Sequence, residues 1–345
     1  MTAERIVVTG SSGMLGSAMV RHLARERHEV LGVDVRPPLD PVPGCSHRIG
    51  DVRDSAFMAR VLKGAGTVLH CAAALPSYSA EQNHDINVNG TRSVLTAGHQ
   101  AGVGRVVHVS STAVYGLPKI VPTTEDHPRE PVDPYTRAKA EAEEVAEEFR
   151  AAGMCVTILR PKTFIGPGRL GLFAMIFEWA DEGRNFPILG RGDALIQMLA
   201  VEDLVTAISH VLAADEEVAN DTYNLGAAEF GTLREDFQAV LDAAGHGKRV
   251  VSLPARPALT LLRALDRARL SPVYERLLRK LLDDSYVSID KARERLGFEP
   301  QLSNGEAILR TYEWWRTSRP DGPRTGRTSG DAWRQRALSL AKVFF

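Results

Sequence analysis

The chain opens on Arg5-Ile6-Val7-Val8-Thr9-Gly10-Ser11-Ser12-Gly13-Met14-Leu15-Gly16, an apolar run that passes through three glycines into a helical pattern. This order predicts a strand, a tight turn and a helix. Free N–H groups and the positive dipole end at such a helix start favour anionic oxygens, as in a pyrophosphate. Gly10 would allow the turn, Gly13 the approach of phosphates, and Gly16 a helix close on the sheet. A plain structural turn is the alternative, because the spacing is not Gly-x-Gly-x-x-Gly.

A second apolar run, residues 29–34, ends in Asp34, which lies 18 residues after Gly16. An acid at this place is typical of dinucleotide-binding folds, where its carboxylate accepts hydrogen bonds from the adenosine ribose hydroxyls. The same carboxylate would repel a 2′-phosphate, so NAD is the expected cofactor. Arg36 leaves NADP as the alternative. A solvated acid at a strand end is the simpler interpretation of Asp34.

Composition and charge exclude several classes of protein. The 345 residues are 44% hydrophobic and 25% charged, which is ordinary for a globular chain of about two domains. Lys plus Arg (42) nearly cancels Asp plus Glu (43), so no electrostatic signature for nucleic acid is present and small molecules are the expected partners. Three scattered cysteines favour neither disulfides nor a metal site. With no signal-peptide pattern and no long apolar run, we expect a cytoplasmic protein.

Apolar runs alternate with helical patterns as far as about residue 165. The runs are residues 68–72, 106–110 and 156–159, and the helices lie near 13–27, 54–63, 84–101 and 134–152. This alternation predicts an α/β fold with a doubly wound parallel (Rossmann) sheet, whose ligands sit beyond the carboxyl ends of the strands.

The later chain predicts a smaller, discontinuous substrate domain. We expect residues 1–165 to form the dinucleotide-binding domain, 195–225 to return to it, and 166–316 to supply the substrate domain. Helices are expected near 172–182, 201–213, 233–244, 258–267 and 273–282, with a strand at 222–225. Ser303 and Glu306 match a capping box before a last helix.

Residues 317–345 read as a Pro/Gly/Arg-rich linker followed by a short apolar tail. On a helical period Trp333, Leu340 and Phe344 share one side, which gives a moderately amphipathic helix. Docking on the protein's own body or on a second subunit is the favoured interpretation. A weak peripheral membrane contact is the alternative.

Catalytic chemistry is indicated by Tyr135 and Lys139, which share a helix face at positions i and i+4. A nearby cation lowers the pKa of a phenol, whose reference value near 10 is too high for a base at neutral pH. Ser111 follows the strand at 106–110, at the edge where a ligand is expected. A hydroxyl there could donate to a substrate carbonyl while Tyr135 moves the proton. Ser110 and Thr112 are the neighbours with which Ser111 could be confused.

Together these motifs resemble the extended short-chain dehydrogenase/reductase family, the NAD-dependent epimerase/dehydratase group, over residues 5–316. The motifs are the glycine turn, Asp34, Asp51-Val52, Cys71-Ala72-Ala73, Asn87-Val88-Asn89-Gly90-Thr91, Ser111 to Tyr115-Gly116, Tyr135-x-x-x-Lys139 and Arg160-Pro161. The resemblance implies that Tyr135 is the acid/base, that Lys139 holds the nicotinamide ribose, and that Ser111 polarises the substrate oxygen.

The resemblance also implies a cofactor-binding set and a homodimer. The set comprises Gly10, Ser12, Gly13, Met14, Leu15, Gly16, Asp34, Arg36, Asp51, Val52, Cys71, Ala72, Ala73, Asn87, Tyr135, Lys139 and Pro161. Asp51 would lie by the adenine, and Asn87 would support the helix and sheet rather than react. No metal is implied.

Departures from the family pattern leave the substrate open. Thr112-Ala113 stands where related 4,6-dehydratases carry an Asp-Glu pair, so dehydration is not expected. Thr163 and Ile196 occupy the places of an asparagine and an arginine that bind a diphosphate in many nucleotide-sugar epimerases. Substrate contacts are expected from Ser111, Thr112, Lys162 and Thr163. Lys162, Arg169, Arg184 and Arg191 are candidate replacement cations, each with a solvated surface position as the alternative.

Three functions follow as hypotheses. The first is an NAD-dependent epimerase or dehydrogenase acting on a secondary alcohol of a sugar or another cyclic alcohol. The second is a 3β-hydroxysteroid-dehydrogenase-like enzyme on an apolar alcohol. The third, from another class, is an NAD-binding scaffold whose tail recruits a partner.

Overall fold

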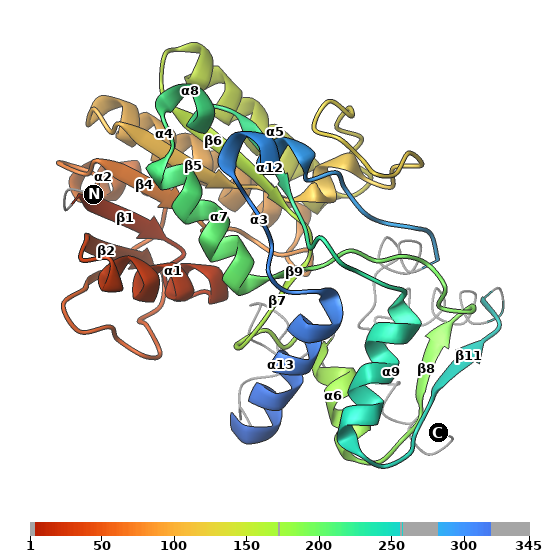
Figure 1. Cartoon of the computed structure of the whole chain (residues 1–345). Helices are drawn as coiled ribbons and strands as arrows, with labels where there is room; N and C mark the ends of the chain where they lie inside the picture. Colours follow the sequence, from red (N-terminus) through yellow and green to blue (C-terminus); the bar gives the residue numbers. More distant parts are fainter. Residues whose placement is uncertain (1–3, 172, 256, 258–281, 319–345) are drawn as a thin grey trace.

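The computed structural model describes residues 4–171, 173–255, 257 and 282–318, and the opening motif has the predicted form (Figure 1). Strand β1 (Arg5–Thr9) turns at Gly10, with φ +69°, into helix α1 (Met14–Arg25), and strand β2 (Glu29–Asp34) follows. A Cβ added at Gly10 would lie 2.7 Å from the Ala72 nitrogen, and one at Gly16 2.1 Å from the Gly10 carbonyl oxygen. Gly16 therefore lets α1 pack against the turn itself, rather than only against the sheet.

A seven-stranded sheet forms the centre of the larger part of the molecule. Its other strands are β3 (Ser46–Ile49), β4 (Thr67–His70), β5 (Arg105–Val109), β6 (Val156–Pro161) and β10 (Thr222–Leu225). The order is β10-β6-β5-β4-β1-β2-β3, and every neighbouring pair is parallel. The predicted doubly wound sheet is confirmed. The strand order reverses between β1 and β4, which places the switch point beside the glycine turn.

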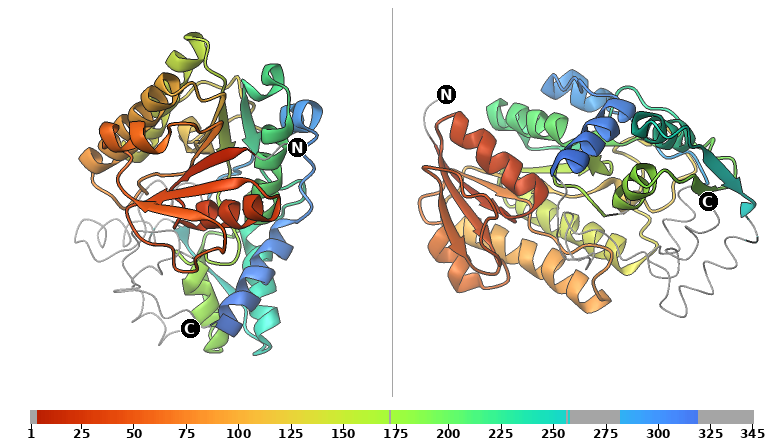
Figure 2. Two further views of the ribbon diagram at one scale, coloured as in Figure 1. Left: turned by 90° about the vertical axis from the view of Figure 1, so that its left-hand side faces the viewer. Right: turned by 90° about the horizontal axis from the view of Figure 1, so that it is seen from below.

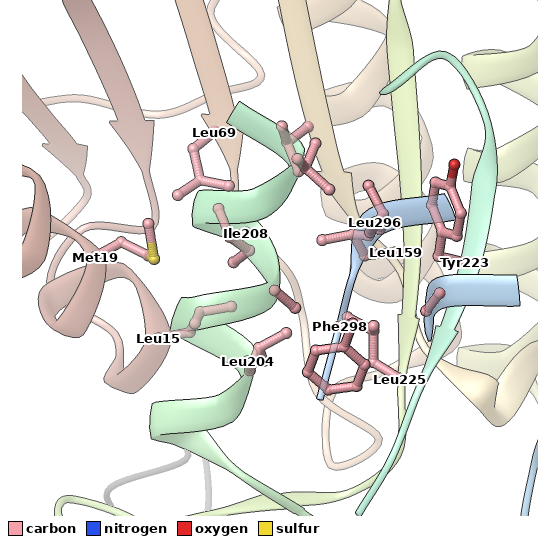
Figure 3. Packing of buried hydrophobic residues seen from close by; sticks show 14 of the residues in the cluster. Leu15, Met19, Leu69, Leu159, Leu204, Ile208, Tyr223, Leu225, Leu296 and Phe298 are labelled. Atoms are coloured by element: carbon pink, nitrogen blue, oxygen red, sulfur yellow. The ribbon is translucent and has the colours of Figure 1, made fainter. Parts of the chain in front are cut away.

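Helices cover both faces of this sheet (Figure 2). One face carries α2 (Ser55–Val61), α4 (Gly90–Gln100) and α5 (Pro134–Ala151), and the other carries α1, α7 (Val201–Ala213) and α12 (Asp290–Leu296). Each face buries a separate apolar core. Figure 3 shows one of them, in which Leu15 and Met19 of α1 lie beside Leu204 and Ile208 of α7.

The segment predicted as one helix over 84–101 is built differently. It begins earlier, with α3 (Ala80–His84), continues through a π-helical turn (Asp85–Asn89), and ends in α4. The early start follows from a capping box, in which Ser79 and Gln82 bond reciprocally. The π turn widens the helix by one residue at Asn87, a feature that is frequent at functional sites.

A smaller lobe lies at the carboxyl-end side of the sheet (Figure 1). Its elements are the paired strands β7 (Phe164–Ile165) with β9 (Leu199–Ala200) and β8 (Phe186–Leu189) with β11 (Val250–Leu253), and the helices α6 (Phe173–Asp181), α9 (Leu233–Ala244) and α13 (Asn304–Ser318). The lobe has its own aromatic-rich core. The four short strands, β3 and the short helices α8 (Glu216–Ala219) and α12 were not predicted, because strands and helices this short carry little periodicity. The predicted helices at 258–267 and 273–282 fall almost wholly outside the described residues, as does the tail.

Buried polar contacts join this lobe to the sheet domain. The Asp203 carboxylate on α7 accepts the N–H groups of Gln301 (2.9 Å) and Leu302 (3.1 Å). Asn304 follows directly, and its side chain bonds the backbone of Ile196 and Met198. The last helix of the lobe thus begins at a fixed point, and the predicted capping box of Ser303 and Glu306 is present there.

One buried carboxyl in this lobe generates a pH-dependent prediction. Asp236 on α9 accepts a bond of 3.1 Å from Asn304, and its burial raises its pKa to about 6. A raised pKa means that the folded state binds the proton more tightly than the unfolded state, so this stabilisation is present at low pH and is lost as pH rises through 6. Asp236→Asn should therefore raise the free energy of unfolding at pH 8 by about 1–2 kcal/mol, and with it the melting temperature. Near pH 4 the substitution should change the melting temperature little.

Thermal unfolding of both proteins at the two pH values checks this expectation. The control is Asp242→Asn, which alters an exposed carboxylate on the same helix that accepts a hydrogen bond from Gln238, and should change the melting temperature at pH 8 much less than Asp236→Asn does. A pH-independent effect of Asp236→Asn would contradict the prediction.

Candidate active site

Helix α5 carries Tyr135, which is predicted to be the acid/base, and Lys139, which is predicted to hold the nicotinamide ribose and to tune Tyr135. Asp133 caps its start by accepting the Thr136 N–H at 2.8 Å, and Pro134 occupies the first helical position. Tyr135 therefore stands in the first turn, half-buried, and Lys139 one turn further on. The helix packs against the short turn Thr112–Tyr115 that follows β5. The predicted phenol, ammonium and hydroxyl-bearing segment are thus brought to one edge of the sheet.

Lys139 is enclosed, with 4% of its surface exposed. Its Nζ donates a hydrogen bond of 3.0 Å to the carbonyl of Val109, the last residue of β5. Burial lowers the pKa of this ammonium to about 8, against the opposing effect of the Glu143 carboxylate. The cation is held at the strand end that precedes Ser111, rather than at the surface.

The structure separates Ser111 from its two neighbours. Ser110 is buried and donates to Glu143 Oε1 at 2.5 Å, and the buried Thr112 hydroxyl donates to the Pro161 carbonyl at 3.4 Å. Ser111 is partly exposed, and its oxygen accepts the Ala113 N–H at 3.2 Å. That bond uses a lone pair and leaves the hydroxyl hydrogen to donate. Of the three hydroxyls, Ser111 is the one whose geometry suits a donor to a substrate.

Glu143 and Arg160 form a buried ion pair behind these residues, and sequence reasoning missed Glu143. Arg160 donates through Nε and Nη2 to the Glu143 carboxylate, the shortest contact being 2.7 Å. Arg160 also donates to the Tyr115 hydroxyl at 2.8 Å, and that hydroxyl donates to Asn224 of β10. The available signal was that Glu143 lies one helical turn after Lys139, on the same side of α5.

The turn at the first helix is closed by hydrogen bonds to Asp34. The carboxylate accepts the N–H groups of Ser12 and Arg36, both at 3.0 Å, and the Ser12 hydroxyl donates to the Arg36 carbonyl at 2.8 Å. A Cβ at Gly13 would meet only the Gly10 carbonyl oxygen, at 3.1 Å, so its outer side is open. A bare helix start beside a fixed carboxylate fits a pyrophosphate and an adenosine ribose.

Other predicted cofactor residues lie around this turn. Asn87 is buried and its side chain accepts the Ala74 N–H at 3.0 Å, which agrees with a supporting role. Asp51 is paired with Arg53 at 2.6 Å, and the Arg53 hydrogen bond lowers the pKa of that carboxyl. Burial raises the pKa of the Cys71 thiol to about 12, which disfavours its thiolate form. The remaining members are Met14 and Leu15 in the first turn of α1, Val52 after Asp51, Ala72 and Ala73 after Cys71, and Pro161 at the end of β6.

The residues predicted to contact the substrate differ in their exposure and in the contacts that they make. Lys162 is 3% exposed, so the solvated alternative is wrong for it; its Nζ donates to the carbonyl and hydroxyl of Ser285, at 2.8 and 2.9 Å. Thr163 is exposed, and its carbonyl accepts the Leu199 N–H. Arg184 pairs with Glu182 near the surface, and the Arg169 guanidinium lies over the Phe164 ring.

Two absences hold for the part of the chain that the structure describes. Within residues 4–171, 173–255, 257 and 282–318, no three His, Cys, Asp or Glu side chains gather where they could hold a metal ion. None of the described helices combines the length and the apolar character needed to cross a membrane.

Comparisons with known proteins agree with this geometry. Residues 6–226 match the model of the NAD dependent epimerase/dehydratase family. The chain is 33% identical over 318 residues to the uncharacterized protein y4nG of Sinorhizobium fredii, covering 91% of this chain and 79% of the relative. It is 29% identical to a 3 beta-hydroxysteroid dehydrogenase/Delta 5→4-isomerase of Mycobacterium tuberculosis, covering 90% of each.

Among solved structures, the dTDP-glucose 4,6-dehydratase DesIV of Streptomyces venezuelae, with NAD bound, is similar at a TM-score of 0.74 and 29% identity. The match covers 91% of this chain and 98% of that one. The family model spans more than half of the sequence, and the glycine turn, Asp34 and the Tyr135/Lys139 pair all lie within the matched residues. The chain therefore belongs to the NAD-dependent epimerase/dehydratase family, the extended short-chain dehydrogenase/reductases, and is an NAD(P)-dependent enzyme of that type.

Proposed function

We propose that this enzyme uses NAD to move a hydride at a secondary alcohol carbon of a cyclic substrate, with Tyr135 as the acid/base, Lys139 as its cation and Ser111 as the donor to the substrate oxygen. The observation that carries the proposal is the bond from Lys139 to Val109. This bond holds the ammonium against Val109, which lies two residues before Ser111 in the sequence. Lys139 itself lies on the helix that also carries Tyr135. NAD supplies the hydride acceptor when bound.

The residues of this chain divide the work. The Ser111 hydroxyl would hold the substrate oxygen, while Tyr135 would take or return the proton on that oxygen. A fixed positive charge beside a phenol favours the phenolate and brings its proton transfer nearer to neutral pH. Because the buried Lys139 Nζ donates a hydrogen bond to a backbone carbonyl, its charge is fixed in position and is shielded from solvent.

Two substrate classes follow from the relatives, a sugar nucleotide and an apolar ring alcohol. Support for the apolar alcohol comes from two described positions near the expected diphosphate clamp. Ile196 is buried where the resemblance implies an arginine, and the ammonium of Lys162 is bonded to Ser285. At these two described positions, a diphosphate would then meet no guanidinium fork. A sugar nucleotide stays the alternative, and a homodimer and a cytoplasmic location stay predictions from the resemblance and the sequence.

The discriminating experiment follows NADH absorbance with UDP-glucose and with a 3β-hydroxysteroid as substrates. NADH formation with the steroid alone supports a dehydrogenase of apolar alcohols. Conversion of the sugar nucleotide, without net NADH and with cofactor retained through gel filtration, supports an epimerase and contradicts the preference for the apolar class.

Tyr135→Phe should abolish turnover and leave NAD affinity within about threefold, because the phenol moves a proton while the pyrophosphate is held elsewhere. Steady-state rates and a fluorescence titration with NAD measure the two effects. Near-normal turnover of this variant would remove Tyr135 from the mechanism.

Ser111→Ala should lower kcat by about 10–1000-fold with little loss of stability, as for a single oxyanion donor. Ser110→Ala is the matched control one residue away. Ser110→Ala removes the bond to Glu143. It should lower the melting temperature more than Ser111→Ala does, and it should lower kcat less. Rates and thermal unfolding of both variants check the contrast. If Thr112→Ala lost the activity instead, the assignment would be shifted by one position.

Asp34→Ala should weaken NAD binding and narrow the difference between NAD and NADP, because a 2′-phosphate would no longer meet a carboxylate. Asp34→Asn separates charge from shape, since the amide keeps an acceptor for the Ser12 or Arg36 N–H. Dissociation constants for both dinucleotides give the answer. Tighter binding of NADP than NAD by the unaltered protein would mean that Arg36 governs the site.

A further inference from the structure

His70, the last residue of β4, is a buried histidine that the mechanism above does not use. It is 1% exposed, and each ring nitrogen meets a threonine hydroxyl. Nδ1 lies 2.7 Å from the Thr9 oxygen, and Nε2 lies 3.1 Å from the Thr91 oxygen. Thr9 is also its register partner on β1, at the switch point of the sheet. The ring therefore connects the neighbouring strand β1, through Thr9, with helix α4, through Thr91.

The directions of these hydrogen bonds are fixed by counting hydrogens. The Thr91 hydroxyl donates its one hydrogen to the Asn87 carbonyl at 2.6 Å, so it can only accept from His70. Nε2 then carries the ring proton, and Nδ1 accepts from the Thr9 hydroxyl. The Thr9 oxygen in turn accepts the Ala72 N–H at 3.4 Å. Burial lowers the pKa of His70 to about 3, with a further contribution from the Lys139 charge, so the ring is neutral.

The ends of this chain of bonds are the three segments assigned to the cofactor. Thr9 directly precedes the Gly10 turn. Ala72 belongs to the segment after β4, whose backbone would be struck by a Cβ on Gly10. Asn87 lies in the π-helical turn, and its side chain returns to the Ala74 N–H. One neutral ring thus connects the glycine turn, the segment after β4 and the π turn.

We propose that His70 is a positioning residue for the dinucleotide, which fixes these three segments as one frame through Thr9 and Thr91. The proposal rests on the cofactor site described under the proposed function. In this role His70 acts through Thr9 and Thr91 and itself touches neither substrate nor cofactor. Its loss should weaken cofactor binding while leaving the chemical step of the bound complex largely intact.

His108 provides a matched control. It lies opposite His70 on the other neighbouring strand, with ring centroids 5.5 Å apart, and it is equally buried at 2% exposure. Neither of its ring nitrogens has a hydrogen-bond partner among the described residues. A ring substitution at His108 thus disturbs the same layer of the core without breaking a hydrogen bond.

The experiment compares NAD dissociation constants, kcat at saturating NAD and melting temperatures for His70→Phe and His108→Phe. His70→Phe leaves two buried hydroxyls without their partner and should raise the NAD dissociation constant about 10–100-fold, with kcat within about threefold. His108→Phe should leave both quantities within about threefold of the unaltered protein.

Rescue and a second route make the test independent of folding. His70→Asn keeps an acceptor near the Nδ1 position and should recover most of the affinity, whereas His70→Gln, which reaches toward Thr91, should recover less. Thr9→Val removes the other partner of the same bond. It should weaken NAD by a similar factor, and combining it with His70→Phe should add little. If His70→Phe does not fold, Thr9→Val carries the test.

Equal weakening by His70→Phe and His108→Phe would overturn the proposal, as would a fall in kcat at unchanged NAD affinity. No rescue by asparagine would do the same. Failure of the cofactor site itself is distinguishable, because the unaltered protein would then not bind NAD at all.

Discussion

The buried ion pair of Glu143 and Arg160 is the interaction on which the position of α5 depends. Removing two charges from water is costly, and such a pair is stable only when its remaining donors and acceptors are satisfied. Here Glu143 also accepts from Ser110 and faces Arg129, while Arg160 also donates to Tyr115 and to the Glu125 carbonyl. The bonds of Arg160 run from β6 of the sheet to α5, to the turn after β5 and to the loop at Glu125. The pair therefore fixes how α5 lies over β5 and β6.

The consequence for the site is rigidity one helical turn away. Lys139 precedes Glu143 by four residues, so fixing Glu143 also fixes the ammonium and, a turn earlier, Tyr135. Burial lowers the pKa of His70 and of His108, with a further contribution from the Lys139 charge, so neither ring adds a second positive charge to this core. A buried cation costs folding free energy, which the surrounding network of hydrogen bonds offsets. Under the proposed function, this is the charge that stabilises the phenolate of Tyr135.

The two lobes are joined by the same means, polar side chains that bond backbone groups of a distant segment. Lys162 reaches Ser285, and Asp203 holds the residues before α13. Each contact satisfies donors that would otherwise be buried and unpaired. These contacts fix the smaller lobe, whose stretches are separated in sequence, against the carboxyl ends of the sheet strands, where substrate and cofactor are expected to meet.

From the sequence alone followed the features that local rules encode. Glycine spacing after an apolar run predicted β1, the turn and α1. The alternation of apolar runs with helical patterns predicted the parallel sheet. The spacing of Tyr135 and Lys139 predicted that they share a helix face. Capping pairs were also readable, although the pair at Ser79 was overlooked, so the helix start at Ala80 and the π turn were missed. These features concern residues a few positions apart, within reach of backbone geometry and periodicity.

The tertiary structure alone decided the rest. Whether Ser110 or Ser111 faces the ligand edge depends on Glu143, 33 residues beyond Ser110. The Tyr115 hydroxyl finds Asn224 at a separation of 109 residues, and Lys162 is withdrawn from solvent by Ser285, 123 residues later. The roles of His70 and Thr9 likewise arise only when two strands lie in register. Such pairings leave no periodic trace in the sequence, because a buried polar side chain is defined by the partner that folding brings to it.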